Sequence, residues 1–122
     1  MKGKFIQRLF HIVPVLLIAG VLNAQPPAGP LAISPQVNPD KTVTFRYFAP
    51  SAREVRLSAQ FEKGPVAMTK AANGMWSVTL GPVKPDIYPY NFIVDGIQVM
   101  DPGNEAYFPN ERFKASLVDI PG

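Results

Sequence analysis

The residue types that carry most enzyme chemistry are scarce in this chain of 122 residues. It contains no cysteine, its single histidine is His11, and no Gly-x-Ser-x-Gly nucleophile motif occurs in it. Zinc and copper sites depend on imidazole and thiolate ligands, and a hydrolase triad needs a base beside its nucleophile. The sequence therefore predicts no metal site, no cofactor and no catalytic triad.

Carboxylates are the remaining candidates for catalysis, because glycosidases use two of them on opposite sides of a cleft. The candidates are Asp95, Asp101 and Glu105. Asp95 precedes a glycine and Asp101 precedes Pro102, and aspartates in such positions usually bond to nearby backbone in turns. We therefore interpret these two as turn residues and expect that the chain is not an enzyme.

Sugar binding is the other chemistry that the composition allows. It usually needs an exposed aromatic ring under the apolar face of a pyranose and amides that reach its hydroxyls. The candidate carbohydrate-binding residues are Trp76, Asn91, Gln98 and Tyr107. Trp76, the single tryptophan, is in phase with the apolar Val78 and Leu80, so a position in the core is the favoured interpretation for it.

The other three candidates each keep a second interpretation. Tyr107 and its neighbour Phe108 lie in a segment rich in proline and asparagine, where they could form a sugar platform or pack against another domain. Asn91 and Gln98 flank an Asp-Gly pair and would face outward if Tyr90 faces the core. They could equally be ordinary solvated side chains.

The elements that must position these residues are strands. Apolar and polar residues alternate with a period of two, which is typical of strands with one buried face. The alternating stretches are 43–48, 55–59, 76–80 and 88–94, and 114–120 is expected to be the last strand. No window shows the 3.6-residue period of a helix, and thirteen prolines after residue 24 oppose helices.

Two turns connect these strands. Asn73-Gly74 and Asp95-Gly96 each supply the positive φ angles of a two-residue hairpin turn. Pro89 cannot donate to a ladder, so its strand should be at an edge there or carry a bulge. The pattern predicts an all-β, antiparallel β-sandwich of about seven strands.

A secretory leader is predicted for residues 1–24. Lys2, Lys4 and Arg8 form its basic start, an apolar run covers 12–22, and cleavage is expected after Ala24. A run of this length is too short for a spanning helix. Residues 25–40 are expected to be a proline-rich lead-in and 41–120 the folded module, in a secreted or periplasmic protein.

Leader removal also changes the charge of the chain. Three of the 12 basic side chains lie in the leader, so nine remain against nine acidic ones. A neutral mature chain gives no support for binding to nucleic acid or to a membrane surface.

Five segments in order resemble the early-set immunoglobulin-like domain of carbohydrate-binding module family 48. They are residues 43–50, 55–57, 74–76, 88–96 and 101–104, with Ala52 between the first two. The resemblance implies an immunoglobulin-like sandwich that precedes a catalytic domain. Such domains precede the catalytic domains of glycogen-branching and debranching enzymes and of secreted feruloyl- or acetyl-xylan-type esterases. The leader and the segment 88–96 are more similar to the esterase branch.

The chain departs from the glycogen-binding members of that family at three places. It lacks a tryptophan in 61–64, has Asn91 where they carry a lysine, and lacks a tryptophan near Ile97 and Gln98. Those departures predict a xylan-type polysaccharide as the partner rather than starch or glycogen.

The resemblance predicts a non-catalytic carbohydrate-binding or accessory module of a secreted polysaccharide-degrading enzyme, an esterase on xylan-type glycan, here without its downstream catalytic domain. A structural domain that packs on the catalytic domain without glycan affinity is the alternative. A third hypothesis is an adhesion or protein-binding sandwich. The chain resembles a truncated product or a fragment of a longer one.

Overall fold

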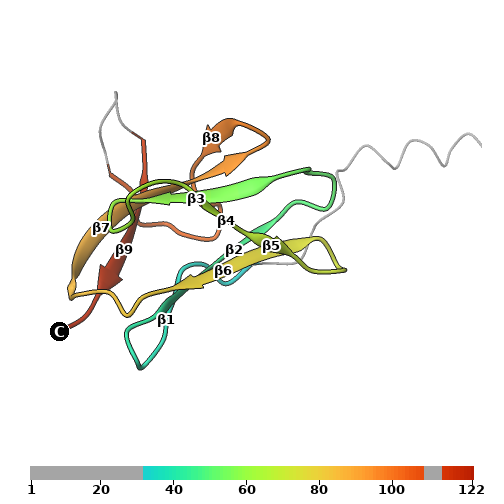
Figure 1. Cartoon of the computed structure of the whole chain (residues 1–122). Helices are drawn as coiled ribbons and strands as arrows, with labels where there is room; N and C mark the ends of the chain where they lie inside the picture. Colours follow the sequence, from blue (N-terminus) through green and yellow to red (C-terminus); the bar gives the residue numbers. More distant parts are fainter. Residues whose placement is uncertain (1–31, 109–113) are drawn as a thin grey trace, which may run out of the picture.

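The chain forms two antiparallel β-sheets that face one another (Figure 1). A computed structural model describes residues 32–108 and 114–122, and this part contains nine strands and no helix. The predicted all-β sandwich is therefore confirmed. No membrane-spanning helix is found in these two ranges. The predicted leader and residues 25–31 of the predicted lead-in lie outside the described residues.

One sheet has four strands in the order β1-β2-β6-β5. Its long strands β2 and β6 pair over their whole length, from Val43 opposite Leu80 to Phe48 opposite Met75. β1 lies in the stretch predicted as lead-in and pairs with β2. The strands are β1 (Gln36–Val37), β2 (Val43–Phe48), β5 (Thr69–Lys70) and β6 (Met75–Leu80).

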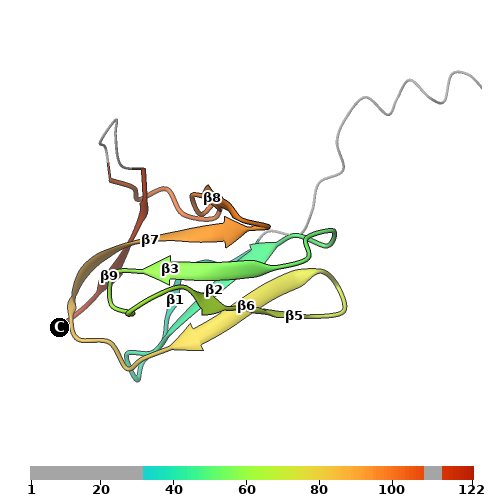
Figure 2. The same ribbon diagram turned by 45° about the horizontal axis from the view of Figure 1, so that its top comes forward.

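The second sheet has five strands around the long strand β7, and it lies above the first in Figure 2. One edge of β7 pairs with β3, and the other is shared by β9 along residues 86–90 and β8 along 92–94. Asn91 lies where β8 and β9 separate. The strands are β3 (Val55–Ala59), β4 (Val66–Ala67), β7 (Asp86–Val94), β8 (Ile97–Val99) and β9 (Ser116–Ile120).

Pro89 lies within β7, where the sequence predicts an edge or a bulge. Its register partner is Leu117 on β9, and its carbonyl accepts a hydrogen bond from the Gln60 amide at 3.1 Å. Gln60 follows the last residue of β3, so Pro89 lies beyond the end of the β3–β7 ladder. The missing N–H of proline therefore interrupts no ladder bond with β3.

The core lies between the sheets and is made by the residues that the alternation placed inward. Phe45 from β2 packs edge-on against Tyr90 from β7, with ring centroids 4.8 Å apart. Phe48, at the end of β2, is half-buried. Its ring lies beside Gly74, where an added Cβ would be 3.3 Å from it. The buried apolar side chains include Val43, Phe45, Val55, Leu57, Trp76, Tyr90, Phe92, Val118 and Ile120.

One of the two predicted turns is confirmed and the other is wrong. Asp95 and Gly96 both have positive φ, and Val94 pairs with Ile97 across them, as a two-residue turn requires. In the other hairpin β5 ends at Lys70 and β6 begins at Met75, so the connection has four residues; within it the Gly74 amide donates to the Ala71 carbonyl. Gly74 alone takes a positive φ there, which is why the two-residue prediction fails.

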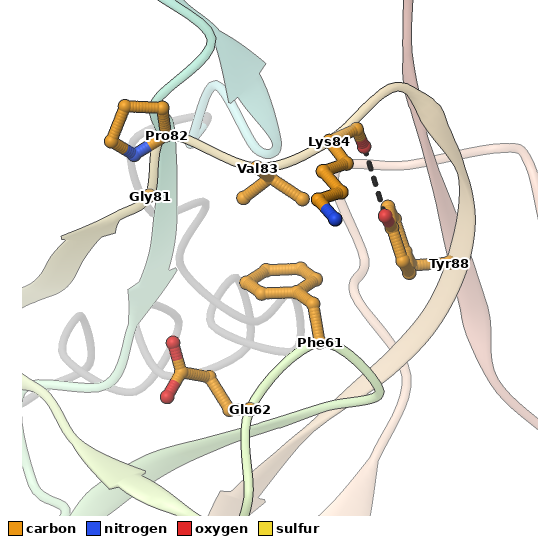
Figure 3. Close-up of a pocket in the computed structure, with 7 residues that line it drawn as sticks. All are labelled: Phe61, Glu62, Gly81, Pro82, Val83, Lys84 and Tyr88. Atoms are coloured by element: carbon orange, nitrogen blue, oxygen red, sulfur yellow. Dashed lines mark hydrogen bonds between the residues drawn. The ribbon is translucent and has the colours of Figure 1, made fainter.

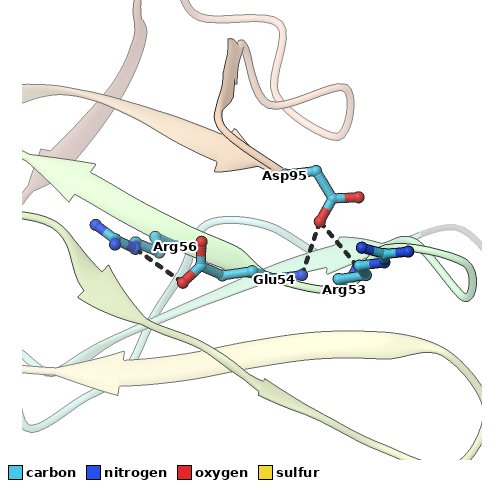
Figure 4. A network of polar contacts seen from close by, with 4 residues as sticks. All are labelled: Arg53, Glu54, Arg56 and Asp95. Carbon is cyan, nitrogen blue, oxygen red and sulfur yellow. Dashed lines mark hydrogen bonds and ion pairs between the residues drawn. The ribbon is translucent and has the colours of Figure 1, made fainter.

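The Asp95 side chain does more than form its own turn. Its Oδ1 accepts hydrogen bonds from the backbone amides of Arg53 and Glu54, each at 2.8 Å (Figure 4). This contact ties the β7–β8 turn to the segment before β3. Beside it, Glu54 and Arg56 form an exposed ion pair at 3.3 Å, which contributes little to stability.

We expect Asp95→Ala to lower the free energy of unfolding by about 1–2 kcal/mol, because two backbone amides lose their acceptor and alanine tolerates positive φ poorly. Asp95→Asn keeps an acceptor oxygen and tolerates this backbone conformation, so it should cost less than half as much. Urea unfolding of both variants measures the difference. Equal losses would contradict the role given to the side-chain oxygen.

Candidate functional site

A polar cavity of about 330 Å³ opens on the outer face of the five-stranded sheet. It lies where β8 and β9 separate along β7, so the sheet itself leaves a gap there. Ser58 on β3 is opposite Asn91 on β7, and both are out of phase with the core residues Leu57 and Phe92. The lining residues are Ser58, Gln60, Pro89, Tyr90, Asn91 and Gln98.

Asn91 is the polar centre of this cavity. Only 4% of its surface is exposed, and its Nδ2 donates to the Lys114 carbonyl at 3.0 Å. Its Oδ1 is buried and accepts no hydrogen bond from any residue in 32–108 or 114–122. A buried acceptor without a partner costs about 1–3 kcal/mol.

A buried hydrogen-bond network fixes Tyr90, one of the residues that line the cavity. The Tyr90 hydroxyl donates to Asp101 Oδ2 at 2.7 Å and accepts from Asn104 Nδ2 at 2.9 Å. Asp101 Oδ1 accepts from the Gly103 amide, and the Asp101 amide donates to Ser116 Oγ. Burial and the nearby Asp101 charge raise the pKa of Tyr90, so its hydroxyl stays a donor. These contacts fix Tyr90 against β9.

The structure brings two of the four predicted sugar-binding residues together. Asn91 and Gln98 both line the cavity. Gln98 is exposed, as expected, whereas Asn91 is buried and its Nδ2 donates to the Lys114 carbonyl.

Trp76 lies in the other sheet, and its predicted core position is confirmed. Its ring is 7% exposed, and its Nε1 donates to the Ala49 carbonyl at 2.9 Å. The Lys70 ammonium lies 5.9 Å from the ring centroid. A ring enclosed in this way has no open face for a pyranose, so we remove Trp76 from the candidate site.

Tyr107 is 53% exposed but does not line the cavity. Its register partner is Ser116, which also pairs with Tyr90. Residues that are directly opposite one another on neighbouring strands share a face, so Tyr107 belongs to the inner face of the sheet, with Tyr90. The Phe108 amide donates to the Ala115 carbonyl, and Phe108, one residue further along, belongs to the outer face, with Asn91. Tyr107 stays a sequence-based prediction without support from the geometry.

Sequence reasoning missed Ser58 and Gln60. The signal that could have found Ser58 is its phase, because a polar residue between Leu57 and the buried Ala59 must face outward. That it lies opposite Asn91 depends on the β3–β7 register, which no local pattern specifies. Gln60 lies beyond the end of β3, outside the alternation.

The carboxylates that were weighed for catalysis have structural partners. Asp95 accepts bonds from two amides and Asp101 from Tyr90 and Gly103, as their interpretation as turn residues expects. Glu105 is exposed. Within the described residues, no group of three histidine, cysteine, aspartate or glutamate side chains is arranged to hold a metal ion.

Residues 32–108 and 114–122 form two antiparallel sheets without a helix, an immunoglobulin-like sandwich with a polar cavity on one outer face. Comparison with protein families agrees with this class. The chain belongs to the carbohydrate-binding module 48 family, the isoamylase N-terminal domain, whose profile matches residues 30–110. A comparison with curated protein sequences finds no match.

Solved structures of similar fold come from much longer proteins. A candidate alpha amylase from Salmonella typhimurium is 28% identical, with a TM-score of 0.55 over 66% of this chain and 13% of its own. A Klebsiella pneumoniae pullulanase complexed with maltotriose is 27% identical, with a TM-score of 0.53 over 73% of this chain and 10% of its own. The chain therefore spans about a tenth of the length of these proteins.

These matches correct two expectations from the sequence. The esterase branch finds no support, because the similar structures are of amylase and pullulanase type. The expected preference for xylan over starch or glycogen is wrong for the same reason: the relatives point to α-glucan. The chain lacks the tryptophans of the glycogen-binding members, but the comparisons do not support the inference that it therefore binds a different glycan.

Proposed function

We propose that this chain is a non-catalytic module that binds α-glucan through the cavity around Asn91 and serves a glycoside hydrolase. Family membership supports carbohydrate binding, and the α-glucan class comes from the amylase and pullulanase relatives. We also propose that the protein is secreted or periplasmic, on the strength of the leader predicted at residues 1–24.

The observation that carries this proposal is the polar lining of the cavity. It combines the amide-bearing residues Asn91 and Gln98 with Ser58, which carries a hydroxyl. Uncharged donors and acceptors of this kind suit the hydroxyls of a neutral sugar, and none of the described residues that line the cavity is charged. Without an aromatic platform at Gln98, the affinity should be low.

Affinity electrophoresis tests the glycan class. The purified chain should be retarded in gels that contain glycogen or amylopectin, and it should migrate normally in arabinoxylan gels and in plain gels. Normal migration in every gel would contradict the proposal and favour a structural domain without glycan affinity.

Asn91→Ala removes a polar group from the cavity lining, and we expect it to weaken maltoheptaose binding about tenfold, the value of one good hydrogen bond. Gln98→Ala, at an exposed position, should weaken it about threefold with no loss of stability. Titration calorimetry measures both. Asp119→Ala is the matched control, because Asp119 is exposed on the same sheet outside the cavity. Unchanged affinity in both cavity variants would place the sugar elsewhere.

A further inference from the structure

A second cleft, of about 350 Å³, lies on the other side of the five-stranded sheet (Figure 3). It is formed by the turn after β3, the loop between β6 and β7, and one residue of β7. Its lining residues are Phe61, Glu62, Gly81, Pro82, Val83, Lys84 and Tyr88. It shares none of them with the cavity around Asn91. Tyr88 and Pro89 are consecutive on β7 and point to opposite faces, so the two sites are separated by the sheet.

One wall of this cleft is the Phe61 ring, which is fixed by contacts with other aromatic rings. Phe61 stacks on the core residue Phe45, with centroids 6.3 Å apart and planes 26° apart. Its ring also meets Tyr88 edge-on at 5.3 Å. Phe61 remains half-buried, so part of its surface is open to the cleft. A ring that is fixed and partly open is the platform on which the C–H face of a sugar packs.

The opposite wall is a loop with a fixed backbone. The Val83 amide donates to the Lys41 carbonyl at 3.0 Å, and the Tyr88 hydroxyl donates to the Lys84 carbonyl at 2.9 Å. Gly81 has a φ of +113°, and a Cβ there would lie 3.0 Å from the Val83 amide nitrogen. The loop therefore packs closely enough to keep the cleft open before a ligand arrives.

The rim of the cleft carries one acceptor and one donor. Glu62 lies beside Phe61, and the Lys84 side chain extends from the loop towards the same ring in Figure 3. Neither side chain has a hydrogen-bond or ion-pair partner among residues 32–108 and 114–122; the ion pair found there joins Glu54 and Arg56. The two opposite charges cancel, so the cleft does not select a charged ligand. It offers an apolar face and both kinds of polar group to a neutral one.

We propose that this cleft is a second carbohydrate subsite that holds one glucosyl unit of an α-glucan. The C–H face of the pyranose packs on Phe61, and its hydroxyls donate to Glu62 and accept from Lys84. The cavity volume is at the lower end of the range for small-molecule sites, which fits a short oligosaccharide end rather than a long chain. The choice of α-glucan rests on the proposed function, whereas the location of the subsite does not.

Titration of the ¹⁵N-labelled chain with maltotriose, followed by backbone amide resonances, tests this subsite. We expect resonances of Glu62, Val83 and Lys84 to shift with one dissociation constant, and those of Asn91 and Gln98 with another. Shifts around Asn91 alone would overturn the second subsite and leave the proposed function standing. Shifts in the cleft alone would support the subsite and overturn the function proposed for the Asn91 cavity. No shifts at all would overturn both.

Two variants of the rim make the test specific without disturbing the core. Glu62→Gln and Lys84→Met should each raise the dissociation constant measured from the cleft resonances about threefold to tenfold. The dissociation constant measured from the Asn91 resonance should not change. Lys63→Ala is the control, since Lys63 is an exposed neighbour that does not line the cleft. Equal effects of all three variants would overturn the assignment. Cleft resonances that shift with protein concentration in the absence of sugar would do the same, by assigning the cleft to self-association.

Discussion

Replacing Phe45 by alanine is expected to lower the free energy of unfolding by about 3–5 kcal/mol. Phe45 is fully buried at the centre of β2 and joins the two sheets through its edge-on contact with Tyr90. It also supports Phe61 from behind. Its loss removes apolar burial and leaves a cavity between two sheets that cannot move together without breaking their ladders.

Urea unfolding followed by tryptophan fluorescence measures this loss, because Trp76 is buried in the same core. Phe48→Ala is the matched control. Phe48 lies on the same strand but is only half-buried, so its loss should be less than half as large. If Phe45→Ala does not fold, Phe45→Leu gives the same comparison at smaller cost. A loss below about 1 kcal/mol in Phe45→Ala would contradict the central position of this ring.

Asp101→Ala is expected to cost about 3 kcal/mol or more, because it leaves buried donors without an acceptor. Asp101 is 2% exposed and accepts bonds from the Tyr90 hydroxyl and the Gly103 amide. Because Tyr90 lines the cavity around Asn91, the same variant should also weaken maltoheptaose binding. Chemical denaturation and calorimetry test the two effects separately. Full stability in Asp101→Ala would show that water replaces the carboxylate without cost.

The same residue gives stability a pH dependence. Burial raises the pKa of Asp101 above its usual range, although hydrogen bonds from Ser34, Tyr90 and Gly103 oppose the shift. The folded state therefore binds the proton more tightly than the unfolded chain. The stabilising contribution of this group is complete below the ordinary pKa of 3.8 and is lost as pH rises through the raised value.

Asp101→Asn should remove this dependence, because the amide does not titrate. Measured from pH 3.5 to 7, the stability of the wild-type chain should fall relative to that of Asp101→Asn as pH rises. A constant difference between the two proteins over this range would show that the pKa of Asp101 is not raised.

Much of the fold could be predicted because its signals are local. The alternation along 43–48, 55–59 and 88–94 identifies the buried faces directly, since successive side chains point to opposite sides of a strand. The Asp95-Gly96 turn was predicted because both residues must take positive φ. The Asn73-Gly74 turn was not, because β5 ends at Lys70 and β6 begins at Met75, which leaves the four residues 71–74 to the connection.

The candidate site was harder to predict. Asn91 and Gln98 were found because they flank the predicted turn, but Asn91 was expected outside and is buried. Its hydrogen-bond partner is the Lys114 carbonyl, more than twenty residues later in the sequence. Trp76 was included for its chemistry, although its phase already placed it in the core. The prediction of a xylan-type glycan was wrong because the absence of three family residues shows which contacts are lost but does not identify the glycan that is bound.

The amino-acid sequence alone determined the strand faces and the all-β class, because these depend on residue type and on local periodicity, and it indicated the family through five short segments in order. The tertiary structure decided which polar groups share a cavity. Ser58 meets Asn91 through the β3–β7 register, and Phe61 faces Lys84 because a loop pinned to Lys41 lies across from it. Such neighbours are set by long-range strand pairing and loop packing, which a local pattern does not encode.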